Sequence, residues 1–167
     1  IRNKLSDIPD KCLMRQHSSH HKNTEMSSSC EHFLQGKGLE ESFTILPGLT
    51  LTFQDYLADH ITCLHESRPD LLEINYCRYG RVGWNMSNGS SIYLGSGDFC
   101  LHTQTLCAGS EMTLPGKHFE GLSICIDTSI FDSNLPELLN DTGITSGILA
   151  DKFCSHETFT TLAGNER

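Results

Sequence analysis

Short apolar segments alternate with turn residues from about residue 43 to residue 127. Of all features of the sequence, this pattern most restricts the folds that the chain can adopt. In residues 49–53 every second residue is apolar, which is typical of a strand with one buried face. Turn sequences such as Asn88 followed by Gly89 separate such segments, because these residues adopt positive φ at little strain. The sequence therefore predicts a mainly β protein, a sandwich or a barrel.

Eight segments of this region are expected to be strands. They are residues 43–46, 49–53, 71–79, 81–86, 91–94, 99–103, 111–114 and 118–127. After residue 127 the pattern changes: Pro136 and Glu137 are typical of a helix start and Gly143 of a helix end. A helix is therefore expected over residues 135–140, and a weaker one over residues 151–162.

The charge of the chain excludes some classes of partner. The net charge is −9, whereas binding to nucleic acid needs clustered Lys and Arg. Residues 1–38 hold six Lys or Arg against four Asp or Glu, are polar, lack apolar periodicity and are expected to be a mobile arm. The His17, His20 and His21 side chains in it are expected to be solvated.

No apolar run approaches the roughly 18 residues of a membrane span, and no signal peptide precedes the first strand. No membrane association is therefore predicted. The chain begins at Ile1 and ends on polar residues, so both ends look like cuts, and the chain is expected to be a piece of a longer protein.

Eight cysteines occur, and none has the C-x-x-C spacing of a zinc or redox site. Cys77, Cys100 and Cys125 fall in strand-like patterns, where a free cysteine behaves as a small buried hydrophobe. Reduced cysteines and a cytoplasmic location are therefore predicted. The alternative is a secreted module with disulfides and with glycans on its three N-x-S/T sequons, at Asn85, Asn88 and Asn140.

Two spacings resemble the motifs of the cupin superfamily. Glu73, six residues and Gly80 match the end of its first motif, and Gly109, five residues and Pro115 match part of its second. The resemblance implies a cupin-like double-stranded β-helix, that is a jelly-roll barrel, followed by a short helical tail.

The metal-ligand positions of that family are not matched. The two histidines of the first motif fall on Glu66 and Arg68, and His65 is one residue out of register, so its side chain would point outward if the strand continued there. No metal and no cofactor is predicted. A two-histidine, one-carboxylate site stays as an alternative, and its candidates are Glu73, His102 and His118.

Several stretches are together similar to the N-terminal effector domains of AraC-type transcription regulators of Firmicutes-like bacteria. They are residues 46–49, 73–81, 93–99, 114–115 and 119–127. The resemblance implies a polar arm over residues 1–38, a cupin-like β-barrel sensor domain over residues 39–130, and C-terminal helices for dimerisation or linkage over residues 131–167. It also implies a DNA-binding half with two helix-turn-helix motifs, which this chain lacks.

A small effector is expected inside the barrel. Alternation places Glu73, Asn75 and Cys77 on one face, taken as inward from the glutamate's role in metal-binding cupins. The predicted ligand-binding residues are Glu73, Asn75, Cys77, Trp84, His102 and His118. Each also has a structural interpretation, with Trp84 in the core, the histidines hydrogen-bonded elsewhere, and Glu73 paired with Arg78 or Arg81.

The predicted function is the ligand-sensing and dimerisation domain of an AraC-type regulator, and not an enzyme. Its predicted partners are a small-molecule effector, a second copy of the chain, and DNA only through the missing half. A metal-dependent cupin enzyme, such as a dioxygenase or isomerase, is the first alternative, and the secreted module is the second.

Overall fold

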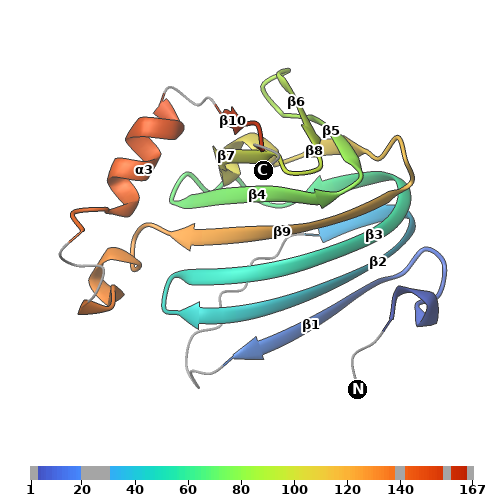
Figure 1. Cartoon of the computed structure of the whole chain (residues 1–167), viewed down its shortest axis with the longest axis horizontal. Coiled ribbons are helices and arrows are strands. Elements are labelled where there is room, and N and C mark those ends of the chain that lie inside the picture. The colour runs from blue at the N-terminus through green and yellow to red at the C-terminus, as the bar shows by residue number, and fades with distance from the viewer. Residues whose placement is uncertain (1–3, 20–30, 138–141, 156–158, 165–167) are drawn as a thin grey trace.

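Ten strands form the body of the computed structural model, which describes residues 4–19, 31–137, 142–155 and 159–164 (Figure 1). The strands are β1 (Leu13–Ser19), β2 (Glu31–Leu46), β3 (Leu49–Leu64), β4 (Leu71–Tyr79), β5 (Arg81–Asn85), β6 (Ser91–Gly95), β7 (Phe99–Thr103), β8 (Ser110–Thr113), β9 (His118–Asp127) and β10 (Thr160–Leu162). The helices are α1 (Gln104–Cys107) and α3 (Ser146–Phe153), with 3-10 turns at Leu5–Asp7 and Asp132–Asn134.

Strand β3 belongs to both faces of the barrel. Residues 49–57 of it pair with β9, and residues 60–63 pair with β8, both antiparallel. One face therefore has the strand order β10-β7-β4-β9-β3, which β2 and β1 continue beyond β3, and the other has the order β3-β8-β5-β6. Two faces of mainly antiparallel strands joined in this order make a jelly roll. The prediction of a mainly β, cupin-like barrel with a short helical part is confirmed.

The core lies between the two faces. On β6, Ile92 and Leu94 are buried while Tyr93 between them is exposed, as period-two alternation requires. Large side chains of the other strands fill the same interior, among them Tyr56, Ile61, Trp84, Met112 and Phe119. A second apolar cluster, which includes Leu72, Leu101 and Ile126, packs against Leu149 and Phe153 of α3 (Figure 1).

The predicted strands agree closely with the structure in the middle of the chain. Residues 71–79, 99–103 and 118–127 have the expected bounds. β2 and β3 are longer than expected, because their outer parts pair with each other where the apolar alternation fades.

The predicted polar arm is partly wrong. Residues 13–19 form β1, which pairs in parallel with β2, and β2 runs through the expected boundary at residue 38. An edge strand is held by backbone hydrogen bonds and tolerates polar side chains. A strand over residues 13–19 is therefore possible even though this segment lacks apolar periodicity. Residues 20–30 lie outside the described part of the chain.

The helical tail also differs from expectation. Residues 138–140 of the helix expected over residues 135–140 lie outside the described residues. The second helix spans residues 146–153, because Thr145 caps it by accepting a hydrogen bond from the Ile148 amide at 3.2 Å. Residues 160–162 form β10 on the edge of β7, an arrangement that suits the β-branched Thr160 and Thr161.

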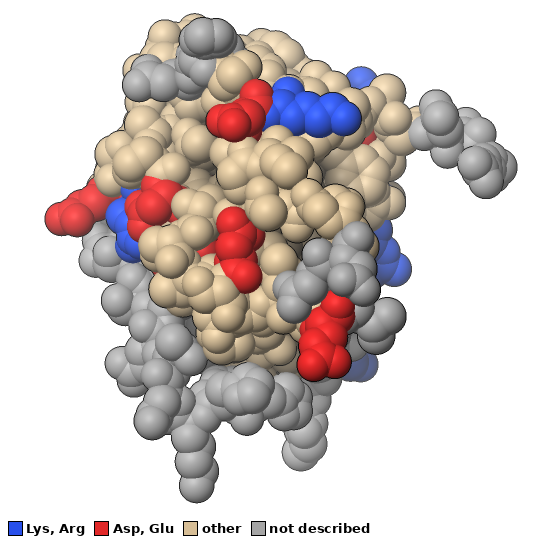
Figure 2. Space-filling model, turned by 90° about the vertical axis from the view of Figure 1, so that its left-hand side faces the viewer, with Lys and Arg blue, Asp and Glu red and all other residues tan. Residues whose placement is uncertain are grey.

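The surface carries the negative charge that the sequence predicts. Figure 2 shows acidic side chains spread over one face, with no continuous basic patch among the residues that the structure describes there. In the described ranges no helix is long and apolar enough to cross a membrane.

Gly80, at the corner between β4 and β5, should not tolerate a side chain. Its φ is +88°, and a Cβ there would lie 2.2 Å from the His118 carbonyl oxygen. We expect Gly80→Ala to lower the free energy of unfolding by about 1–2 kcal/mol through backbone strain and by roughly 1–3 kcal/mol more through overlap. Urea denaturation measures this.

Gly89 supplies the matched control, because its φ is +83° but no atom lies within 4 Å of the added Cβ. Gly89→Ala should lower the free energy of unfolding only through backbone strain, by about 1–2 kcal/mol. Equal losses for the two variants would contradict the packing described for the corner.

Candidate functional site

A cavity of about 190 Å³ lies inside the barrel. Its polar wall consists of Arg15, Glu40, Ser42, Thr50, Thr52, Gln54, His65, Glu73, Asn75, Gln104 and Ser123. Its apolar wall consists of Val82, Trp84, Leu94, Met112 and Phe119, and three thiols complete it, those of Cys63, Cys107 and Cys125. A lining that combines apolar and aromatic surface with polar groups is typical of small-molecule sites.

The strand register brings the polar wall together. Glu73 on β4 lies directly opposite His102 on β7 and Cys125 on β9. Asn75, two residues on, lies opposite Ser123 of β9. Directly opposed residues of antiparallel strands project to the same face, so these side chains share the inner surface.

His102 is fully buried behind this wall. Its Nδ1 lies 2.9 Å from the Thr103 carbonyl oxygen, which can only accept, so the Nδ1 carries the proton and the Nε2 is left as an acceptor. The Asn75 Nδ2 donates to this Nε2 at 3.0 Å, and the Glu73 Oε2 lies 3.6 Å from it. The Trp84 ring meets the imidazole edge-on with centroids 5.1 Å apart, which fixes the ring plane.

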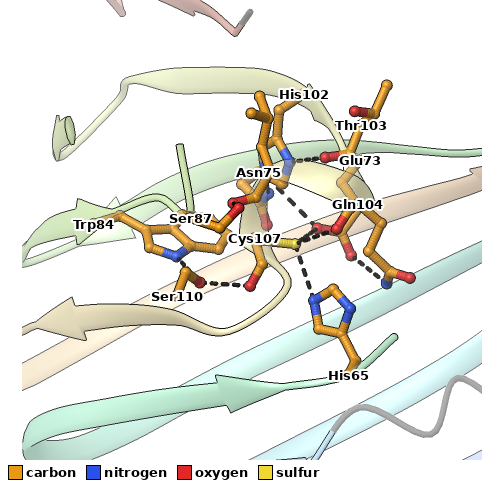
Figure 3. A network of polar contacts seen from close by, with 11 residues as sticks. His65, Glu73, Asn75, Trp84, Ser87, His102, Thr103, Gln104, Cys107 and Ser110 are labelled. Carbon is orange, nitrogen blue, oxygen red and sulfur yellow. Dashed lines mark hydrogen bonds and ion pairs between the residues drawn. The ribbon is translucent and has the colours of Figure 1, made fainter. Parts of the chain in front are cut away.

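Gln104 and Cys107 of the short helix α1 and His65, which follows β3, also line the cavity, and Figure 3 shows Cys107 between His65 and Glu73. The Gln104 Nε2 donates to the Glu73 Oε1 at 3.2 Å, and the Cys107 Sγ lies 3.6 Å from the Glu73 Oε2. The His65 Nε2 approaches the same Sγ to 3.2 Å, while its Nδ1 donates to the Glu66 carbonyl oxygen at 2.7 Å. The ligand atoms of Glu73, His102 and Cys107 therefore lie within 4.8 Å of one another, and His65 contacts the thiol of this group.

A second polar group brings β1 into the cavity wall. The Arg15 Nε donates to the Glu40 Oε2 at 2.9 Å, and the buried Tyr56 hydroxyl donates to the Glu40 Oε1. Burial, and then the negative charge of Glu40, raise the pKa of Tyr56 well above its ordinary value, so the phenol stays a donor. Arg15 thus links the N-terminal strand to the barrel interior.

The structure places three of the predicted binding residues in the cavity wall: Glu73, Asn75 and Trp84. His102 lies directly behind them. The structural interpretation that paired Glu73 with an arginine is wrong, because Gln104, Cys107 and His102 surround the carboxylate instead, and Arg78 pairs with Glu120 at 3.2 Å.

Cys77 and His118 lie away from the cavity. Cys77 faces inward but sits at the β4–β5 corner, where its Sγ meets the carbonyl oxygens of Tyr79 and Gly80 at 3.7 and 3.6 Å. His118 lies on the outer face, with its Nε2 3.1 Å from the Asp55 Oδ1. A metal site shared by Glu73, His102 and His118 is therefore not formed.

Sequence reasoning missed His65, Gln104 and Cys107. His65 was expected to point outward if the strand continued, but β3 ends at Leu64, and the side chain turns to the interior. Gln104 and Cys107 lie on α1, and this helix of four residues is too short to show a helical apolar pattern in the sequence. A strand end before residue 65 is the one signal that would have found His65.

Buried thiols near the site are poor nucleophiles at neutral pH. Burial raises the pKa of Cys77 to about 11 and that of Cys100 to about 12, and it raises that of Cys125 further still. Since the thiolate is the reactive form, none of these three supports nucleophilic catalysis.

No family model and no curated protein matches the sequence. Among solved structures, a cupin 2 conserved barrel domain protein from Salinispora arenicola is 12% identical with a TM-score of 0.45, over 66% of this chain and 87% of that one. A cupin 2 conserved barrel domain protein from Leptotrichia buccalis is 13% identical with a TM-score of 0.43, over 54% of this chain and 40% of that one. The Clostridium difficile EutQ protein is 13% identical with a TM-score of 0.40, over 59% of this chain and 64% of that one.

Alkaline pH should destabilise the fold through its buried thiols. The pKa of Cys100 rises from 9.0 to about 12 on folding. Its contribution is therefore complete below pH 9 and is lost as the pH rises towards 12, by at most about 1.4 kcal/mol per pH unit. We expect Cys100→Ala to reduce the decline in the free energy of unfolding between pH 9 and pH 11, measured by urea denaturation.

Leu101→Ala is the matched control, because Leu101 is a buried neighbour on β7 that cannot ionise. It should lower stability at every pH without changing the slope. A slope unchanged in Cys100→Ala would show that this thiol does not govern the alkaline limb.

Proposed function

We propose that the chain is the effector-binding and dimerisation domain of a cytoplasmic AraC-type transcription regulator, and that it is not an enzyme. The observation that carries the proposal is the cavity inside the jelly roll, which has a polar wall on β4 and β9 and an apolar wall around Trp84. The similarity of residues 43–140 to AraC-type effector domains supports the regulatory role.

The cavity suits a small effector. A dry protein cavity of about 150 Å³ holds benzene, so about 190 Å³ suits one small ring or a short polar chain. Asn75, Ser123 and Gln54 offer both donors and acceptors, whereas Trp84 and Phe119 offer flat apolar surface. A small polar or aromatic molecule fits this combination.

The fold offers a route from the cavity to both ends of the chain. Arg15 of β1 lines the cavity. β10 pairs with β7, the strand of His102, and the Gly164 amide donates to the Asp98 Oδ1 at 3.2 Å. An effector that prefers one arrangement of these edge strands shifts the population of states in which a downstream DNA-binding half is presented.

A metal-dependent cupin enzyme, such as a dioxygenase or isomerase, is the second candidate. The convergence of Glu73, His102 and Cys107, whose ligand atoms lie within 4.8 Å of one another, favours it. Turnover by a metal-loaded preparation would support this candidate over a sensor.

Effector binding can be followed through Trp84, the single tryptophan of the chain. A screen of small polar and aromatic molecules by thermal shift should yield compounds that raise the melting temperature and change the Trp84 fluorescence. Asn75→Ala should weaken binding of such a compound roughly tenfold, through loss of one hydrogen bond.

His118→Ala is the control, because His118 lies outside the cavity and should leave the affinity unchanged. A compound that loses affinity equally in both variants does not bind in this cavity. A screen without any stabilising compound would count against the effector role.

The predicted dimer can be tested at α3. Ile144, just before this helix, and Ile148, in its first turn, are 54% and 51% exposed, which suits a contact with a second copy. Sedimentation should show a dimer at micromolar concentration that Ile148→Asp dissociates. Tyr93→Asp, which alters a similarly exposed apolar residue on β6, should leave it intact, and a monomeric parent chain would contradict the dimer.

A further inference from the structure

The Cys107 thiol lies beside a base in the cavity wall. The His65 Nε2 is 3.2 Å from the Cys107 Sγ. The His65 Nδ1 lies 2.7 Å from the Glu66 carbonyl oxygen, which can only accept, so the Nδ1 carries the proton and the Nε2 presents a lone pair to the thiol. Figure 3 shows the His65 ring directed at the sulfur. A thiol whose proton points at an imidazole has the arrangement that makes cysteine a nucleophile.

The other groups around this sulfur make its reactivity depend on His65. The Glu73 Oε2 lies 3.6 Å from the Sγ, and the Gln104 carbonyl oxygen lies 3.4 Å from it. A carboxylate and a carbonyl oxygen both disfavour an isolated thiolate. The thiolate is therefore favoured when its proton stays beside it, on His65, as an ion pair.

Cys107 can be reached through the cavity. Its side chain is only 3% exposed at the surface, yet it lines the cavity of about 190 Å³ together with His65. A cavity of about 150 Å³ holds benzene, so a reagent that reaches this sulfur has the size of one small ring. Trp84 and Met112 give the same cavity apolar surface. The site therefore selects small and mainly apolar molecules.

An electrophile that reacts by addition suits such a confined site, because no leaving group has to depart. An α,β-unsaturated carbonyl compound is the simplest member of this class. Its carbonyl oxygen needs a hydrogen-bond donor, and the Gln54 amide and the Ser123 hydroxyl in the cavity wall both supply one.

We propose that Cys107, with His65 as its base, is a covalent binding site for small α,β-unsaturated carbonyl compounds. The His65 Nε2 takes the thiol proton, and an electron pair of the sulfur forms a bond to the β-carbon. The electron pair of the C=C bond moves towards the carbonyl group and gives an enolate. His65 then returns the proton to the α-carbon, so every atom of thiol and enone stays in the adduct, and no oxidant or reductant is needed.

As a class of effector, these compounds rest on the proposed sensor function, whereas the adduct itself does not. Cys107 lies on α1, which follows β7 directly, and β7 pairs with the edge strand β10. A molecule bonded to Cys107 is therefore held at the corner of the cavity that leads to this edge.

Mass spectrometry of the native, untagged chain treated with cyclohexenone, a small cyclic enone, tests the site. We expect one adduct to form first, and peptide mapping should place it on Cys107. Cys125 is the internal comparison, because it lines the same cavity. Burial, and then the charge of Glu73, raise the pKa of Cys125 far above its ordinary value. Cys107 should therefore react at least about tenfold faster than Cys125.

Two pairs of variants assign the roles. Cys107→Ser should abolish the first adduct, whereas Cys63→Ser, which alters another buried thiol of the same cavity, should keep it. His65→Gln should slow the reaction at Cys107 roughly 100-fold through loss of the base, whereas His60→Gln, on the exposed side of β3, should not. Circular dichroism of each variant confirms that it is folded.

Three results would overturn the proposal. They are no adduct on Cys107, labelling of Cys125 as fast as that of Cys107, and an unchanged rate in His65→Gln. The effector role is tested separately, by the reversible compounds of the thermal-shift screen. Compounds that bind Cys107→Ser and the parent chain equally would keep that role while the covalent site fails. An adduct on Cys107 in a chain that no reversible compound stabilises would leave the covalent site alone.

Discussion

The passage of β3 through both faces of the barrel is the constraint on which the rest of the structure depends. One continuous strand pairs with β9 over residues 49–57 and with β8 over residues 60–63, so the two faces cannot slide past each other. The register of β9 on β3 then sets that of β4, and β4 sets β7. The meeting of Glu73 with His102 is the last step of this chain of pairings. A slip of one residue anywhere along it would turn the polar wall outward.

A polar wall inside an apolar barrel is unfavourable unless its groups find partners. Here they do. The Trp84 Nε1 donates to the Ser110 Oγ at 2.7 Å, and this hydroxyl donates to the Cys107 carbonyl oxygen at 2.6 Å. Among the described residues, the one buried side-chain polar atom without a partner is the Thr105 Oγ1. Stability alone would be served as well by apolar residues, so a hydrogen-bonded interior of this kind supports the binding site proposed above.

The sequence predicts strands whose apolar and polar residues alternate along their whole length. It does not predict elements whose conformation depends on pairing with a neighbouring strand or on where a strand ends. β4, β7 and β9 have their expected bounds, because each alternates over its whole length. β1 and β10 are edge strands that form by pairing with β2 and β7, and their own sequences show no strand-like alternation. Alternation along β4 correctly placed Glu73 and Asn75 in the cavity wall. Alternation shows which face of the sheet a residue occupies, but not its position along the barrel axis. Cys77, which faces inward outside the cavity, was therefore wrongly assigned to the site. The His65 error has the same origin, since its direction depends on where β3 ends.

The cavity wall is assembled from segments that are far apart in the sequence, and for the proposed sensor function this decides which ligands would have a regulatory effect. A ligand that touches only β4 and β9 contacts central strands of one face and makes no contact with the edge strands. A ligand that also touches Arg15 contacts the edge strand β1 itself, and a ligand at the His65 and Cys107 corner lies next to β7, which pairs with the edge strand β10. Only such differential contact shifts a population, however tight the binding.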